Sequence, residues 1–174
     1  MQQPIVSPDE FREAVIHALV SRLGDLGKIK IQKLVYFLQE AYRLPLGCRF
    51  YLHYYGPYSE EVETGISNLK FMGYVNVQAD PEGYGFHVTR TSSSGEPGWT
   101  TVIRNAESEV DSAVQGFGLM DASQLELAAT IHYVRRSFGF NKGDVIASVR
   151  SRKPKFSRKL ISDAYDSLAS MNLL

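Results

Sequence analysis

The sequence has one cysteine, no long apolar run and no excess of either charge. Cys48 cannot form a disulfide bond within the chain. No apolar stretch reaches the roughly 20 residues that span a bilayer, and no charged-then-apolar leader opens the chain, so we expect a cytoplasmic protein without membrane contact. Because 19 Lys and Arg balance 19 Asp and Glu, nucleic-acid binding would require a local basic patch.

The length and composition indicate one globular domain, or one domain with a helical extension. The chain has 174 residues, of which 44% are hydrophobic and 22% charged, and such a chain buries a substantial core without a partner. The periodicity described below predicts an α+β fold that is mostly helical.

Apolar residues recur at helical spacing in three N-terminal stretches, which are 7–24, 28–44 and 59–73. Glycine or proline stands where each of these predicted helices ends. Between the second and third, residues 50–55 are short and aromatic and are bounded by Gly47 and Gly56, which favours an extended segment.

A predicted β-hairpin completes the N-terminal half. Residues 74–78 and 84–89 are strand-like, and the turn chemistry of Asp80-Pro81-Glu82-Gly83 joins them. Helices followed by such a hairpin predict a winged-helix-like region over 1–91. We expect a linker rich in Ser, Gly and Pro at 92–98, and then a helical segment over 99–174 that packs on the first region as one compact unit.

The C-terminal segment shows three further helical patterns. The first covers 102–117 and the last covers 160–168. Between them, Ser123 and Glu126 have the spacing of a capping box, which predicts that a helix begins at Ser123.

Three motifs carry a resemblance to a known family. Residues 30–38 (KIQKLVYFL), the aromatic run 50–55 with the following Gly56-Pro57-Tyr58-Ser59, and residues 153–157 (KPKFS) resemble the signature of the YwgA-like family of uncharacterised bacterial proteins. The Lys-Leu-x-Tyr-Phe and Tyr-Gly-Pro pieces also resemble, more distantly, the Panacea or SocA-like antitoxin domain. That resemblance implies neutralisation of a toxin by direct contact, hence a protein-binding role.

A winged helix also suggests DNA binding, with the third helix in the major groove. The charges disfavour this use, because Glu60, Glu61 and Glu63 occupy the first turn of that helix and Asp80 and Glu82 the wing turn. These acids either stabilise the helix N-terminus or form an acidic surface that docks a protein. We expect a docking edge made of the residues that join the extended segment to this helix: Tyr55, Gly56, Pro57, Tyr58, Glu60 and Glu61.

One basic cluster precedes and opens the last predicted helix. Its members are unopposed by acids in the sequence until Asp163, and they are Arg150, Arg152, Lys153, Lys155, Arg158 and Lys159. Such a cluster is either a solvated loop or a contact for an anion or an acidic partner segment.

No residue pattern predicts catalysis, a metal site or a cofactor. The histidines at 17, 53, 87 and 132 are isolated from other metal-ligand residues at ligand spacing, and Cys48 has no activating base nearby in sequence. The sequence therefore predicts a non-catalytic, regulatory protein-binding module of an antitoxin-like or adaptor-like kind. The alternatives are a nucleic-acid-binding winged-helix regulator that uses the basic cluster near 150–159, and a homodimer formed through the C-terminal helices.

Overall fold

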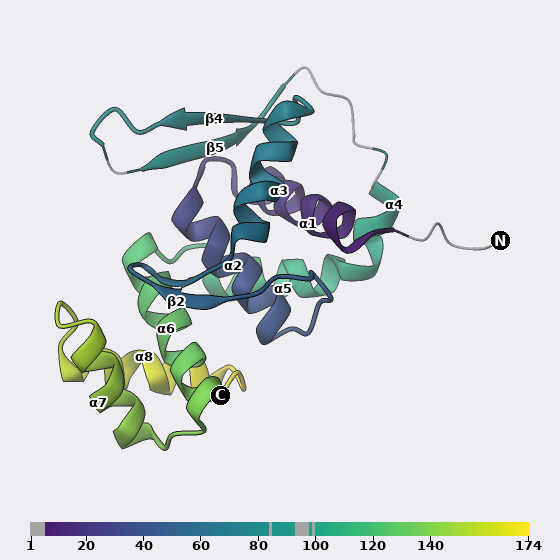
Figure 1. Cartoon of the computed structure of the whole chain (residues 1–174). Coiled ribbons are helices and arrows are strands. Elements are labelled where there is room, and N and C mark those ends of the chain that lie inside the picture. The colour runs from purple at the N-terminus through teal and green to yellow at the C-terminus, as the bar shows by residue number, and fades with distance from the viewer. Residues whose placement is uncertain (1–5, 84, 93–97, 99) are drawn as a thin grey trace.

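The computed structural model describes residues 6–83, 85–92, 98 and 100–174. Helices α1 (Pro8–Leu23), α2 (Lys28–Glu40) and α3 (Glu60–Phe71) form the N-terminal half together with a small sheet (Figure 1). Helix α1 begins with a capping box, because Ser7 accepts from the Glu10 amide while the Glu10 carboxylate accepts from the Ser7 amide.

The sheet contains β1 (Leu26–Gly27), β4 (Val75–Ala79) and β5 (Phe86–Arg90). These strands are antiparallel in the order β1-β5-β4, with Val77 opposite Val88. Helix α1, strand β1, helices α2 and α3 and the β4–β5 wing therefore occur in the order of a winged helix, which confirms the predicted winged-helix-like fold. The predicted second wing strand included Tyr84, which lies outside the described residues.

A second hairpin stands between α2 and α3. Strand β2 (Tyr51–His53) pairs with β3 (Gly56–Tyr58), so the segment predicted as merely extended is half of a two-stranded ribbon. At its turn, Gly56 lies close to Lys33 of α2 and to Thr130 of α6 (Ala122–Phe138), and the hairpin crosses these helices in Figure 1. Helix α2 ends at Glu40, earlier than predicted, because the chain turns at Arg43 with a φ of 65°.

The C-terminal half is helical, as predicted. Its elements are α4 (Thr100–Ile103), the 3-10 turn η1 (Arg104–Ala106), α5 (Glu107–Phe117), α6 (Ala122–Phe138), α7 (Lys142–Arg152) and α8 (Arg158–Ser170). The predicted helix over 102–117 is thus interrupted. The predicted capping box was wrong, because Asp121 and Gln124 form it in place of Ser123 and Glu126.

One hydrophobic cluster includes side chains of both halves. Phe37 of α2 stacks on Phe117 of α5, with ring centroids 4.1 Å apart, and α6 packs along α2 beside this pair. Most of the predicted linker, residues 93–97, lies outside the described residues. Among the described helices, none is long and apolar enough to cross a membrane.

Candidate functional site

Two polar side chains of α2 hold strand β3 and the β2–β3 turn in place. The buried Lys33 ammonium donates to the Pro57 carbonyl at 2.7 Å. Its neighbour Gln32 donates to the Ser59 carbonyl at 2.9 Å and accepts from the Ser59 amide at 3.0 Å. Because buried hydrogen-bonding groups are costly to leave unpaired, these contacts fix the backbone of β3 on α2.

Gly56 allows the turn to approach α6 closely. Its φ is 85°, and a Cβ atom there would lie 3.0 Å from the Thr130 hydroxyl, 3.3 Å from the Glu126 carbonyl and 3.4 Å from Lys33 Cε. Glycine adopts this conformation without a steric penalty and has no side chain to collide. The turn is therefore wedged between α2 and α6.

Glu126 supplies the negative charge at this junction. Its side chain is buried, with Oε2 accepting from Lys155 at 2.6 Å and Oε1 lying 2.9 Å from the Lys153 ammonium. The second of these is an ion pair without favourable hydrogen-bond geometry. Lys153 also donates to the Tyr54 carbonyl, so the segment after α7 is tied to the same turn as α2.

The three motifs that carry the family resemblance therefore meet in space. Residues 30–38, 50–59 and 153–157 converge on the β2–β3 turn, joined by Lys33, Gln32 and Lys153. Sequence reasoning missed Glu126, because it was assigned to a helix cap. A carboxylate inside a run of apolar residues, 125–131, was the available signal for a buried partner of lysine.

The predicted basic cluster is largely paired in the structure. Glu126, which is distant in the sequence, pairs with Lys153 and Lys155. Arg150 donates to the carbonyls of Pro154 and Phe156, and Lys159 pairs with Asp163. Arg152, which donates to Ser148, and Arg158 are exposed. Lys153 is the buried member of the cluster, and most of the cluster faces solvent although its three lysines are in ion pairs.

The predicted docking edge divides into structural and surface residues. Gly56 and Pro57 are buried and support the edge from within, while its role in docking a partner stays a prediction. Glu61 accepts from the Ser59 hydroxyl at 2.5 Å, and this bond lowers the pKa of Glu61 to about 2. Glu60 is exposed and accepts from the hydroxyls of Tyr51 and Tyr58.

An aromatic groove lies between the β2–β3 hairpin and the wing. A cavity of about 270 Å³ is lined there by residues that include Lys28, Lys33, Tyr55, Tyr58 and Phe86. Four aromatic side chains of the hairpin and wing are exposed: Tyr54 by 83%, Tyr55 by 52%, Phe86 by 49% and Tyr51 by 43%. We call this surface, from Tyr51 to Tyr58 together with Phe86, the hairpin groove.

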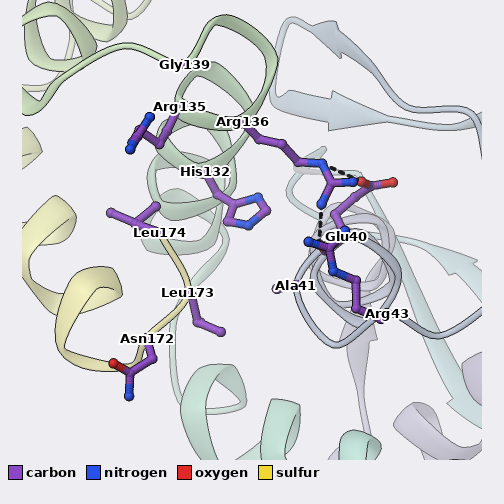
Figure 2. A pocket seen from close by; sticks show the side chains of 10 residues that line it. All are labelled: Glu40, Ala41, Arg43, His132, Arg135, Arg136, Gly139, Asn172, Leu173 and Leu174. Carbon is purple, nitrogen blue, oxygen red and sulfur yellow. Dashed lines mark hydrogen bonds and ion pairs between the residues drawn. The ribbon is translucent and has the colours of Figure 1, made fainter.

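A second cavity, of about 380 Å³, lies on another part of the molecule (Figure 2). It is bounded by the end of α2, the last turns of α6 and residues 172–174. Elsewhere, burial raises the pKa of the Cys48 thiol to about 11, which disfavours the reactive thiolate. Within the described ranges, His, Cys, Asp and Glu form no group of three that could hold a metal ion.

No protein-family model matches the chain. The chain is similar to a protein of Bacillus subtilis (strain 168) that bears the name "Uncharacterized protein YwgA". The two are 24% identical over 145 residues, which cover 81% of each chain. This similarity agrees with the resemblance to YwgA-like proteins. A relation to the Panacea domain stays a prediction.

The Lys33 ammonium makes folding stability depend on pH. Burial lowers its pKa from 10.5 to about 7, partly offset by Glu126. Between pH 7 and 10.5 the unfolded chain therefore binds a proton that the folded chain lacks. The contribution of Lys33 to the free energy of unfolding thus rises with pH in this range and is lost as the pH falls towards 7. We expect the free energy of unfolding of the wild type, relative to Lys33→Met, to increase between pH 7 and 9.

The slope of this difference is at most about 1.4 kcal/mol per pH unit for one proton. Urea denaturation of both proteins at pH 7, 8 and 9 measures it. Parallel pH profiles for the two proteins would show that Lys33 does not titrate in this range.

Proposed function

We propose that this chain is a non-catalytic protein-binding module, antitoxin-like or adaptor-like, that docks a partner segment in the hairpin groove. The observation that carries the proposal is the exposure of Tyr54 and Tyr55 on a turn that Lys33 and Lys153 hold in place, with the exposed Phe86 of the wing lining the same cavity as Tyr55. Exposed aromatic side chains on a preorganised surface are typical of binding hot spots.

The rigid support lowers the entropic cost of binding. Lys153 holds the Tyr54 carbonyl and Lys33 holds the Pro57 carbonyl, so the two ends of the turn are fixed before a partner arrives. Tyrosine has few rotatable bonds and presents both an apolar ring and a hydroxyl. Little ordering of the hairpin remains to oppose association.

The charge at the groove indicates the chemistry of the partner. Glu60 is exposed beside Tyr51 and Tyr58, and no basic side chain in the described part of the chain pairs with it. Lys28, one of the two lysines that line the cavity, already pairs with Glu63 and lies 4.9 Å from the centroid of the Phe86 ring. A partner segment with apolar side chains and a Lys or Arg complements this surface.

The same geometry disfavours DNA at α3. The hydroxyls of Tyr51 and Tyr58 contact Glu60, so hairpin side chains lie at the first turn of the helix that would enter the major groove. Glu60, Glu61 and Glu63 in that turn would oppose phosphates. A protein partner fits this end of α3 better than a nucleic acid does.

Affinity capture from the native lysate, with nuclease and moderate salt, tests the proposal. We expect a stoichiometric protein partner whose capture by Tyr54→Ala falls by at least tenfold, because an exposed aromatic side chain that acts as a binding hot spot contributes about 2 kcal/mol or more. The matched control is Phe71→Ala, which removes a ring that is 93% exposed at the opposite end of α3.

Capture that is unchanged in Tyr54→Ala, or reduced equally in Phe71→Ala, would contradict docking at the hairpin groove. Recovery of nucleic acid alone, lost on nuclease treatment, would instead support the nucleic-acid regulator.

A further inference from the structure

Half of the residues that line the cavity at the ends of α2 and α6 carry side-chain hydrogen-bond donors. Figure 2 shows His132 and Arg136 of α6 and Arg43, just beyond α2, directed toward a common space, with Asn172 and Leu173 on the opposite side. Its volume, about 380 Å³, is within the range of small-molecule sites. It is separate from the residues that line the hairpin groove.

His132 presents one unpaired ring nitrogen to this cavity. The residue is 5% exposed, and its Nδ1 lies 2.7 Å from the hydroxyl of the buried Tyr36. Among the described residues the Tyr36 hydroxyl contacts no other acceptor, so we assign it as the donor to Nδ1, which places the imidazole proton on Nε2. Nε2 has no partner in the described part of the chain, and the ring points into the cavity (Figure 2).

Burial also keeps this imidazole neutral. Desolvation, reinforced by Arg136, lowers the pKa of His132 to about 4. Near neutral pH the side chain therefore offers an N–H donor without a charge, in the manner of a fixed dipole. Any positive charge in the cavity must come from the arginines.

The three arginines around the cavity differ in the contacts that they already make within the protein. Arg136 pairs with the Glu40 carboxylate at 3.1 Å and donates to the Glu40 carbonyl at 2.6 Å, so it caps the end of α2. Arg43 and Arg135 have no ion pair within the described ranges, and Nε of Arg135 is buried without a hydrogen-bond partner. Glu40 is the one acidic side chain in the lining.

The backbone at Arg43 is a second sign of function. Its φ of 65° lies in the left-handed region, which glycine or asparagine adopts more readily than arginine. A turn alone would be served better by glycine, whereas this conformation directs the guanidinium toward His132 and the cavity (Figure 2). Strained residues of this kind cluster at ligand sites.

We propose that this cavity binds a small molecule that carries a phosphate or a carboxylate group. The Arg43 guanidinium and the His132 Nε2–H hold the anionic group, while Ala41 and Leu173 contact the rest of the molecule. A guanidinium beside a neutral N–H donor matches the oxygen atoms of either anion. This site would act independently of docking at the hairpin groove.

Titration of the full chain with phenyl phosphate, and separately with benzoate, tests the proposal by amide chemical-shift changes at constant ionic strength. We expect saturable shifts at residues 40–43 and 132–139 with one or both probes, and the stronger binder identifies the anion. Arg43→Gln should weaken binding at least tenfold. The matched control, Arg158→Gln, also removes one exposed cation, from the start of α8, and should leave the affinity unchanged.

Shifts that do not saturate with either probe, or equal weakening in the two variants, would overturn the proposal. Arg43→Gly provides an independent check, because glycine suits the left-handed backbone and the variant should fold. It should lose binding as Arg43→Gln does, and retained affinity in this variant would show that the guanidinium holds no ligand.

Discussion

Glu126→Ala is expected to lower the free energy of unfolding by roughly 3–5 kcal/mol. The substitution removes the carboxylate that opposes Lys153 and Lys155 and leaves the buried Lys153 ammonium without its counter-charge. Loss of one member of a buried ion pair is costly because the remaining charge stays out of water. Guanidinium chloride denaturation of the purified variant at pH 7 measures the change.

Two further variants separate charge from packing. Lys155→Ala removes the partly exposed lysine and should cost about 1 kcal/mol or less, as surface pairs do. Adding Lys153→Met to Glu126→Ala should recover part of the loss, since no uncompensated ammonium remains at Tyr54. A Glu126→Ala variant as stable as the wild type would contradict the description of this junction as an ion cluster that supports the hairpin.

Gly56→Ala is expected to destabilise the fold by about 3 kcal/mol. Two effects add, since a φ of 85° is unfavourable for alanine by about 1 kcal/mol and overpacking costs about 1–3 kcal/mol. The new methyl group would meet the Thr130 hydroxyl at 3.0 Å and the Glu126 carbonyl at 3.3 Å. Thermal and denaturant unfolding of the variant measure the sum.

Gly73→Ala is the matched control that measures the cost of the left-handed backbone conformation alone. Gly73 has a similar φ of 80°, but a Cβ atom there has no neighbour within 4 Å. It should therefore show the backbone cost of about 1 kcal/mol without the collision. Equal losses in the two variants would mean that the turn moves away from α6 at little cost, and that the hairpin is not wedged as described.

The position of the β2–β3 turn should also affect the proposed docking function. If a partner recognises Tyr54 and Tyr55 in their present positions, displacement of the turn should weaken capture even where the protein remains folded. Preorganised contacts lose affinity when their backbone becomes mobile. Capture by Gly56→Ala at a temperature well below its unfolding transition should thus fall, while capture by Gly73→Ala should not.

The winged-helix-like fold could be predicted because its signals are local. Helical apolar spacing, glycine at helix ends and the Asp80–Gly83 turn each depend on residues close in sequence, and the structure confirms the helices and the wing. The end of α2 was predicted too late, because Tyr42 continues the apolar pattern while the left-handed Arg43 turns the chain. Hydrophobic periodicity indicates which face of a helix is buried, but it does not indicate at which residue the backbone leaves the helical conformation.

The candidate site was predicted only in part, because its contacts join residues far apart in sequence. Tyr55 was expected at the docking edge, and its side chain is exposed in the structure. The burial of Gly56 and Pro57 was not predicted, since it depends on α6 packing against the turn. Glu126 could not be assigned to Lys153 and Lys155 by spacing, as about thirty residues and helix α7 separate them.

The sequence by itself determined the helices, the wing and the three motifs, because hydrophobic periodicity and turn residues act over a few positions. Only the tertiary structure decided that those motifs meet at one turn, that Glu126 pairs with two lysines of the basic cluster, and that His132 and Arg43 border a common cavity. Burial and charge pairing are properties of the packed chain. They arise when α6 comes to lie against α2 and the hairpin, and so no single segment carries them.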